Sequence, residues 1–397
     1  MCSIVHNIFL ILLKISNFVI PKISSFMLSP DSFYYFFREN YGYPMFDNVL
    51  FYPKYNGAKL VDEFISYVHG DFKERYHRMD KKEKSQFGSI VLHDQEPLMD
   101  LWYFASTYLK KHFVDKSFTE NEVAKLLYNK FSTKKIPIWC HSEKNSREID
   151  FLKEAGWIDC YYWYHGLISL NWFNDWRWCN DLDRARKNPM AKKFMIYARD
   201  FTGTRQYRKD LIDQLYSLRH LILYDWQRSK IIDPSFSAKI DIDDARNSYI
   251  HIIAETIFDT GKQHLTEKTL KPIVMSQPFI MASGPGSLEY IRSYGFQTFN
   301  TVWNEDYDLE TDSDRRLEMI VELINTLAAL SDSQFQKMYE KTLPIIAHNR
   351  KWFYSEKFYD ILIGELETNI ETAIKKSNNQ DRLLSMEPSQ SLPGSDS

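Results

Sequence analysis

Cysteine is scarce in this chain. Four of the 397 residues are cysteines, and no two of them have C-x-x-C spacing (Cys2, Cys140, Cys160 and Cys179). Such scattered cysteines predict neither a disulfide framework nor the clustered thiolate and imidazole ligands of a structural zinc site. We therefore expect no bound metal, and a reducing compartment, the cytoplasm, is the simplest location.

An excess of charge of one sign is also missing. The formal net charge is −3 at pH 7, from 50 Lys and Arg against 53 Asp and Glu. Proteins that bind nucleic acid generally present a broad basic field, so this balance argues against nucleic-acid binding.

Several catalytic signatures are absent. The sequence has no P-loop, no G-x-S-x-G elbow, no complete G-x-G-x-x-G fingerprint and no H-E-x-x-H pair. The acidic stretch DIDDAR at residues 241–246 lacks the glycine and glutamate of a calcium loop, so it predicts the charged start of a helix. Because these motifs are absent, the sequence predicts no bound cofactor.

Long apolar runs are nearly absent as well. Residues 4–20 are strongly apolar, but the run falls short of the about 20 residues that a spanning helix needs, and His6 and Lys14 interrupt it. No small-residue cleavage site follows it. We expect residues 1–27 to form an apolar extension that contacts a membrane peripherally, with a membrane anchor as the alternative and Met27 as a second possible start.

The opposite end of the chain is polar. Residues 375–397 are rich in Ser and Pro and contain almost no large apolar side chain. Such a segment buries too little surface to offset its ordering entropy, so it predicts a disordered tail.

Between these ends, short apolar runs alternate with segments of helical periodicity, which indicates α/β units with parallel sheets. In the first half, strands are expected at residues 49–52, 89–92, 136–140 and 161–164. In the second half, strands are expected at residues 194–198, 221–224, 248–254, 279–282 and from 296 to 298. The intervening helices include residues 120–128, 143–155, 208–218, 270–276, 287–294, 315–330 and 332–353.

The polar stretch at residues 174–193 contains Pro189 and predicts a linker between two domains. We expect an N-terminal Rossmann-like domain at residues 28–185, a C-terminal one at 190–355 and a C-terminal helix at 356–374. Ligands of such domains bind beyond the carboxyl ends of the strands, so a cleft between the two domains is the expected site.

The stretch HLTEKTLKPIVMSQPFIMASGPGSLEY, residues 264–290, raises the main functional question. The preceding strand ends at Glu255, at the carboxyl end where ligands bind, so Glu255 is a candidate donor-site residue. Pro272 places the helix start close to Thr266–Thr269. Glu267 and Lys268 then lie at a helix N-terminus, which favours anions. This pattern predicts a diphosphate at Lys268 and sugar or ribose hydroxyls at Glu267, and a solvated ion pair at a helix start remains the alternative.

A basic loop follows the first strand of the second domain. It contains Arg199 and Arg205, and Arg208 and Lys209 open the next helix. Guanidinium groups bind phosphate oxygens through two hydrogen bonds at once, so the loop predicts a second phosphate contact. A loop paired with surface acids is the alternative.

Polar side chains follow the strands of the first domain. His93, Asp94 and Glu96 come after the second strand, and His141 follows the third. Asp94 or Glu96 is placed to act as a general base, unless Asp94 only caps a helix. His165, among aromatic residues, joins His93 and His141 as a candidate for an acceptor cleft, although a histidine beside rings is more often structural.

Residues 194–305 resemble α1,3-fucosyltransferase-like glycosyltransferases. The resemblance is carried by a strand ending at Glu255, a ten-residue loop and LTEKTLKPIVMSQPFI, and by TGTRQYRKDLIDQL upstream. TEKTLKPIVMSQPFIMASGPGSLEYIRSYGF also looks like glycosyltransferase-like proteins of phages and environmental bacteria. Thr256 follows Glu255 at a position where the fucosyltransferase-like family usually has Asn, so the resemblance does not identify the donor sugar.

The resemblance implies a GT-B fold and transfer of a sugar from a nucleotide sugar to a glycan hydroxyl, with inversion and without an obligatory metal. It implies that Lys268 and Arg205 hold the diphosphate, that Glu267 holds donor hydroxyls, and that the base lies in the N-terminal domain. Two alternatives stay open: a nucleotide-sugar epimerase on the same scaffold, and a non-catalytic protein that binds glycans or nucleotides.

Overall fold

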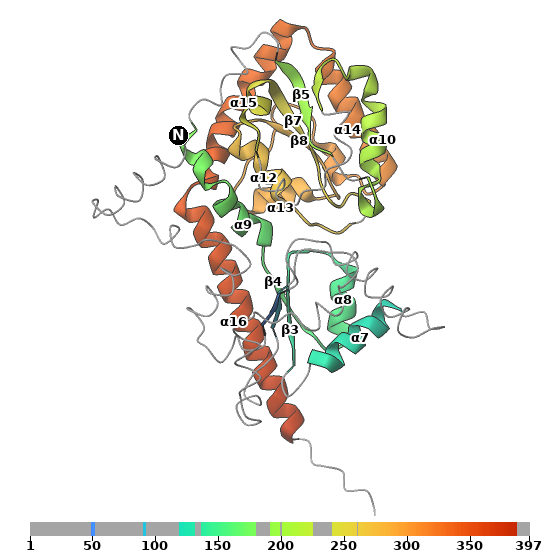
Figure 1. Ribbon diagram of the computed structural model, residues 1–397, viewed down its shortest axis with the longest axis vertical. Helices are drawn as coiled ribbons and strands as arrows, with labels where there is room; N and C mark the ends of the chain where they lie inside the picture. The colour runs from blue at the N-terminus through green and yellow to red at the C-terminus, as the bar shows by residue number, and fades with distance from the viewer. Residues whose placement is uncertain are drawn as a thin grey trace, which may run out of the picture.

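A computed structural model defines the fold. It describes residues 119–131, 136–179, 191–198, 201–224, 240–259 and 261–386, and the backbone of the short strands at 49–51 and 90–92. Figure 1 shows two α/β units, the second above the first. The predicted α/β class with a parallel sheet in each of two units is confirmed.

The first unit contains a four-stranded sheet in which every neighbouring pair is parallel. Its order is β1 (Val49–Phe51), β2 (Ile90–Leu92), β3 (Ile138–His141) and β4 (Ile158–Tyr161). In the part of this unit that the structure describes, it is accompanied by α7 (Glu120–Phe131) and α8 (Arg147–Glu154). The predicted strand at residues 161–164 is wrong, because β4 ends at Tyr161 and the chain turns into a helix at Tyr164. The aromatic residues there pack in the core instead of extending the sheet.

The second unit contains a second parallel sheet, ordered β6-β5-β7-β8. Its strands are β5 (Lys192–Ile196), β6 (Ile222–Leu223), β7 (Ser248–Ala254) and β8 (Phe279–Ala282). All seven residues of β7 are buried, as expected for a central strand covered on both faces. The chain goes from β5 out to β6 and returns to β7 on the other side of β5. This reversal is the point at which doubly wound sheets bind ligands.

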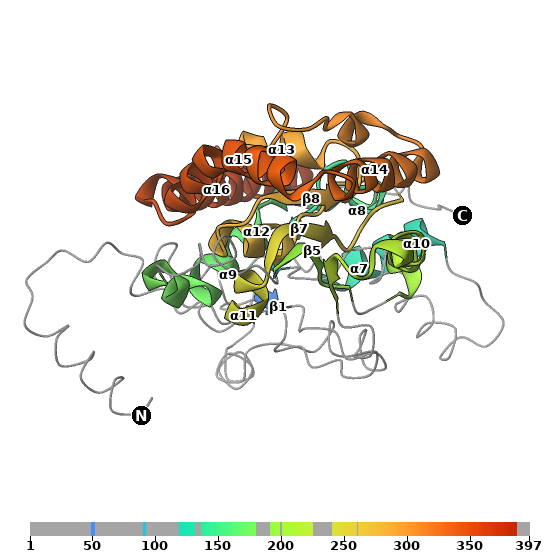
Figure 2. The ribbon, with the colours of Figure 1, turned by 90° about the horizontal axis from the view of Figure 1, so that it is seen from above.

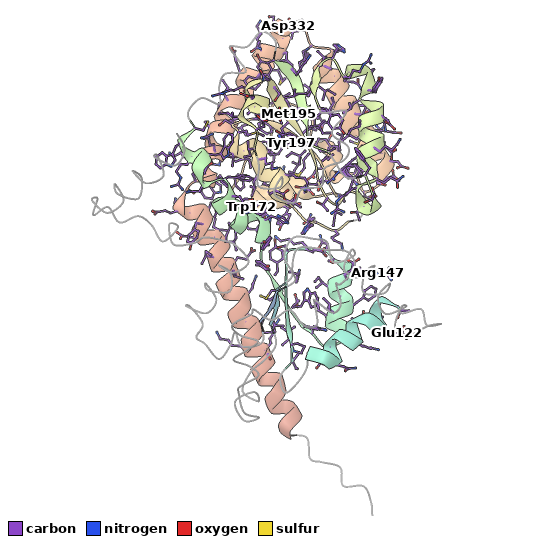
Figure 3. All side chains as sticks on the ribbon, viewed as in Figure 1. Glu122, Arg147, Trp172, Met195, Tyr197 and Asp332 are labelled. Carbon is purple, nitrogen blue, oxygen red and sulfur yellow. The ribbon has the colours of Figure 1, made fainter. Side chains whose placement is uncertain are left out.

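Helices enclose this second sheet, and Figure 2 shows α14 and α15 above the strands and α11 below them. The helices are α10 (Tyr207–Gln214), α11 (Ile242–Arg246), α12 (Glu267–Val274), α13 (Ser287–Ser293), α14 (Ser313–Ala328) and α15 (Asp332–Phe353). Figure 3 places Met195 at the centre of this unit, where it packs with Ala245 of α11 and Met275 after α12. Residues 296–298, predicted as a strand, carry no regular secondary structure.

Two helices tie the units together. Helix α9 (Tyr164–Trp172) follows the first sheet but packs on α12 of the second unit, and α16 (Glu356–Met386) runs back along β4. Asn369 donates to the carbonyl of Tyr161 at 2.9 Å, and Ser377 donates to that of Ile136 at 2.8 Å. The predicted tail at 375–397 is therefore corrected, because the helix continues to Met386 and Ser377 is buried against the first sheet.

None of the helices in the described ranges is long and apolar enough to cross a membrane. The apolar extension predicted at residues 1–27 lies outside those ranges, as does the predicted domain boundary near residue 185.

Candidate functional site

The start of α12 is held by a buried carboxylate at the carboxyl end of β7. Glu255 has no exposed surface, and its oxygen atoms accept hydrogen bonds from the backbone nitrogens of Thr256 and Thr266, each at 3.1 Å. The hydroxyls of Thr266 and Thr269 also donate to it, at 2.7 and 2.6 Å. Three of these four bonds, from Thr266 and Thr269, therefore fix the first turn of α12 to the sheet. The predicted helix start is confirmed, with Thr266 as the N-cap.

Lys268 stands at this helix start with its ammonium group partly open to solvent. Its side chain is 26% exposed, and Nζ lies 3.1 Å from Thr266 Oγ1 and 3.4 Å from Glu267 Oε1. Because Thr266 also donates to Glu255, the lysine is linked through one hydroxyl to the buried carboxylate. A positive charge at a helix N-terminus makes a strong local site for an anion.

Glu267 connects the second unit to α9. Its carboxylate lies 3.4 Å from Nδ1 of His165, and both side chains are at most 5% exposed. Burial alone raises the pKa of Glu267, but the charges of Lys268, His165 and Lys271 outweigh it and lower the pKa to about 2. The carboxylate is therefore held ionised. The structure thus brings together three predicted site residues, Glu267, Lys268 and His165.

The basic residues after β5 differ in their surroundings: one is buried in the fold, and another lies beside open space. Arg208 is buried and donates to the backbone carbonyl of Glu255 at 2.7 Å, beside the Tyr207 hydroxyl, which donates to the same carbonyl. Arg205 ends the 3₁₀ turn η5 (Gly203–Arg205) and is half-buried. Gly203 has a φ of +55° and no atom within 4 Å of a Cβ position, so the loop borders open space at this point.

Other basic residues of this region serve the fold. Lys193 donates to the carbonyls of Ala328 and Leu330, near the end of α14, and Lys192 donates to the carbonyl of His220. Lys192 and Lys193 therefore bind backbone carbonyls of the second unit, so being basic is not enough to make a residue of this region a candidate phosphate ligand. Arg199 lies outside the described residues.

His141 lies at the end of β3 and is 3% exposed. Its Nδ1 accepts a hydrogen bond from the backbone nitrogen of Glu143, and burial lowers the pKa of the imidazole to about 4. His141 is thus neutral and enclosed. It is not a member of the pair formed by His165 and Glu267. His93, Asp94 and Glu96, predicted to follow β2, lie outside the described residues.

The two units meet in a set of contacts that the sequence did not indicate. Lys144 and Gln263 exchange backbone hydrogen bonds, at 2.9 and 3.0 Å. Lys262, 4% exposed, lies 3.2 Å from Glu143 Oε2 and 2.8 Å from Glu148 Oε2. No local motif marks Lys262, because its partners are more than a hundred residues away in the chain.

A second contact between the units is aromatic. The Tyr161 hydroxyl of β4 hydrogen-bonds the Tyr290 hydroxyl of α13 and lies 3.1 Å from that of Tyr294. The Lys144 ammonium lies 4.2 Å from the centre of the Tyr290 ring, and Tyr294 donates to Glu365 of α16 at 2.7 Å. These contacts fix the position of the first unit relative to α13 and α16.

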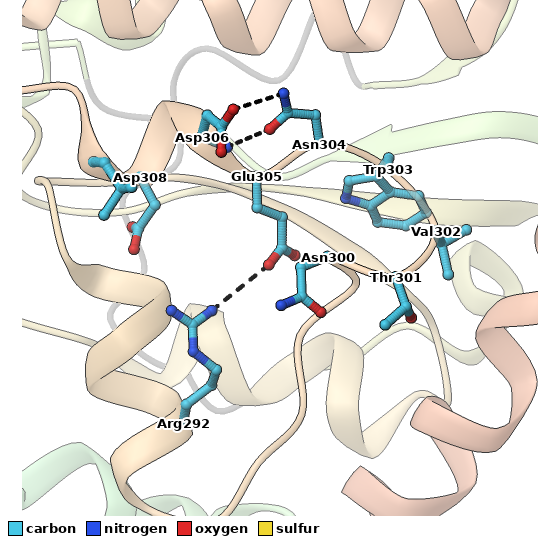
Figure 4. Close-up of a pocket in the computed structure, with 10 residues that line it drawn as sticks. Arg292, Asn300, Thr301, Val302, Trp303, Asn304, Glu305, Asp306 and Asp308 are labelled. Atoms are coloured by element: carbon cyan, nitrogen blue, oxygen red, sulfur yellow. Dashed lines mark hydrogen bonds and ion pairs between the residues drawn. The ribbon is translucent and has the colours of Figure 1, made fainter.

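A polar hollow of about 620 Å³ lies beside α13 and the loop that follows it, shown in Figure 4. Arg292 reaches Glu305 at 3.6 Å and Thr298 at 2.9 Å, so its charge is engaged. Asp308 binds the backbone nitrogen of Leu288 and caps α13. None of the predicted site residues lines this hollow, and the loops carrying Asp94, Glu96 and Arg199 lie outside the described residues. We therefore locate the candidate site from the geometry of α12 and not from the hollow.

In the ranges the structure describes, no group of three or more His, Cys, Asp or Glu side chains is arranged to hold a metal ion. Fold and site together define a two-sheet α/β protein in which a partly exposed lysine stands at a helix N-terminus at the carboxyl edge of a parallel sheet.

Comparison with known proteins adds one match. No family model and no curated protein matches the chain. Among solved structures, it is similar to WaaG, a glycosyltransferase involved in lipopolysaccharide biosynthesis, with a TM-score of 0.36 and 11% identity. That alignment covers 80% of this chain and 84% of WaaG. At this TM-score, we base no conclusion on the likeness.

Proposed function

We propose that the protein is a GT-B glycosyltransferase that moves a sugar from a nucleotide sugar to a hydroxyl of a glycan acceptor, with inversion at the transferred carbon. The observation that supports this proposal is the start of α12. There, the partly exposed ammonium of Lys268 and the helix N-terminus lie at the carboxyl end of β7, where a doubly wound sheet binds phosphate.

The leaving nucleoside diphosphate gains negative charge as the glycosidic bond breaks. In this proposal, Lys268 and the N-terminus of α12 stabilise that charge, and Arg205, on the loop after β5, also binds the diphosphate. Because these groups are fixed before the reaction, they stabilise the transition state without reorganising. Glu255 acts as a positioning residue, since its carboxylate is fully buried and engaged with α12.

Glu267 orients the ammonium group of Lys268 and the imidazole of His165. Its two oxygens contact Lys268 and His165, so a donor hydroxyl would bind Glu267 alongside these partners. Asp94 or Glu96, which follow β2, is proposed as the base that removes the proton from the acceptor hydroxyl. The donor requires no metal in this scheme.

A donor-binding experiment tests the proposal. The full chain is titrated with GDP, UDP and CMP in a thermal-shift assay, and the responding nucleotide selects the labelled donor sugars for turnover assays. Ligand at a hundred times its Kd stabilises the folded state by about 2.7 kcal/mol. Lys268→Ala should weaken binding and turnover about 10- to 100-fold, because a charge-assisted hydrogen bond contributes about 1.5–3 kcal/mol.

Lys209→Ala is the matched control. Lys209 is exposed and, among the described residues, forms its ion pair with Asp213 on its own helix, at 2.5 Å, so its removal should leave donor binding unchanged. Full donor affinity and rate in Lys268→Ala would contradict the proposal. Sugar transferred to an added acceptor distinguishes transfer from epimerisation, whereas glycan binding without any turnover would favour a non-catalytic protein.

A further inference from the structure

A second hollow, of about 630 Å³, lies between α14, α15 and the loop at residues 302–307. Its volume falls within the range of small-molecule sites. None of the residues assigned to the α12 site lines it. The apolar lining comes mainly from Met319, Leu323, Leu327, Leu330 and Met338, with the rings of Trp303 and Tyr307 beside them.

The helix period explains how this lining arises. Met319 and Leu323 are four residues apart on α14, and Gln334, Met338 and Lys341 are separated by four and then three residues on α15. Residues at such intervals share one face of a helix. Helix α14 therefore turns an apolar stripe toward the hollow, whereas α15 contributes Met338 between polar and charged side chains.

The rim of this hollow is basic. Lys337 and Lys341 are exposed, and in the described parts of the chain neither makes a hydrogen bond or ion pair. Arg315 is engaged by Glu318 at 2.9 Å and by Glu322, which also lines the hollow, at 3.3 Å, so this group has one more negative than positive charge. The positive charge at the mouth comes from the two lysines of α15, which exceed that one negative charge.

An apolar interior under a positive rim selects a ligand with an aliphatic body and one anionic group. A nucleotide fits less well, because the aliphatic side chains of Leu323, Leu327 and Met338 offer no partner for the polar edges of a base. Burying such edges unpaired is unfavourable. Methionine at two positions of the wall adapts to a flexible chain.

We infer that this hollow is a binding site for a single-chain fatty acid or a related aliphatic anion, separate from the proposed donor site. The two lysines bind the carboxylate, and the methionine and leucine side chains contact the alkyl chain. This inference is independent of the proposed glycosyl transfer, because it uses none of the residues of that site.

Calorimetric titration of the full chain with decanoate and with decanol, both below their micelle-forming concentrations, tests the inference. Decanoate should bind about tenfold more tightly than decanol, since two exposed ion pairs contribute modestly. In the double variant Lys337→Gln, Lys341→Gln, this difference should disappear while decanol still binds. Leu323→Gln should weaken both ligands.

Lys351→Gln removes an exposed lysine from the same helix outside the hollow and should leave both affinities unchanged. The inference is overturned if decanoate fails to bind the parent chain, if the double variant retains the preference, or if Leu323→Gln affects neither ligand. Displacement of decanoate by GDP, UDP or CMP would instead assign the hollow to nucleotides and overturn it as well.

Discussion

Glu255→Gln is the most informative single substitution, because it keeps the size of the side chain but removes its charge and replaces one of its two acceptor oxygens with a donor. Each carboxylate oxygen accepts one backbone N–H and one threonine hydroxyl: Oε1 from Thr266 and Thr269, and Oε2 from Thr256 and Thr266. An amide has one NH₂ group, so in either orientation one backbone N–H faces a donor.

The Thr266 hydroxyl already receives the backbone and side-chain nitrogens of Lys268, so it cannot turn to accept a bond from an amide. The Thr269 hydroxyl can. The NH₂ group is therefore expected in the place of Oε1, which leaves the backbone N–H of Thr266 without an acceptor.

An unsatisfied buried N–H costs about 1–3 kcal/mol, and the remaining bonds weaken when the acceptor loses its charge. The neutral amide is easier to bury, which offsets part of this loss. We expect a net destabilisation of about 3 kcal/mol, which corresponds to a fall in Tm of roughly 6–12 °C for a unit of about 200 residues.

Urea unfolding followed by circular dichroism measures this change, with an unchanged m-value showing that only stability has moved. Glu289→Gln on α13 is the matched control, because that side chain is exposed, and it should shift stability by less than about 0.5 kcal/mol. If Glu255→Gln were as stable as the control, the carboxylate would not be the group that holds α12.

Lys262→Met removes the buried cation between Glu143 and Glu148 and should cost about 3–5 kcal/mol in urea unfolding, since it leaves buried carboxylates unpaired. A loss below about 0.5 kcal/mol would show that water already screens this contact. For Glu267, the lowered pKa makes the ionised form stabilising: the contribution is complete above the ordinary value of 4.5 and disappears as pH falls toward 2. Unfolding free energies of the parent and Glu267→Gln should therefore converge by on the order of 3 kcal/mol over this window, because each pH unit is about 1.4 kcal/mol, and parallel curves would refute the lowered pKa that Lys268, His165 and Lys271 produce.

Local signals predicted several elements of the second unit to the residue. The strands β7 and β8 and the helix α15 have the predicted bounds, because each combines a clear apolar pattern with a strong boundary residue. Gly295 follows α13 in the left-handed region, with φ of +89°, a backbone conformation that glycine adopts readily at a helix end.

Contacts between distant segments were not predictable in this way. The polar sequence after residue 374 gave no sign that Ser377 reaches Ile136, because the partner lies 241 positions away. For the same reason, the sequence identified Glu255 as a ligand candidate but not as the buried acceptor of four hydrogen bonds. Its partners became apparent only once the ten-residue loop had closed on the sheet.

The return of α16 to the first sheet has a consequence for how the chain is made. A ribosome releases β4 long before residues 356–386, and the whole second unit emerges in between. Until α16 arrives, β4 lacks the helix that packs along it and that donates from Asn369 to the carbonyl of Tyr161. The unit that is synthesised first is therefore completed late, and a chain truncated before α16 would lack the contacts that this helix makes with β3 and β4.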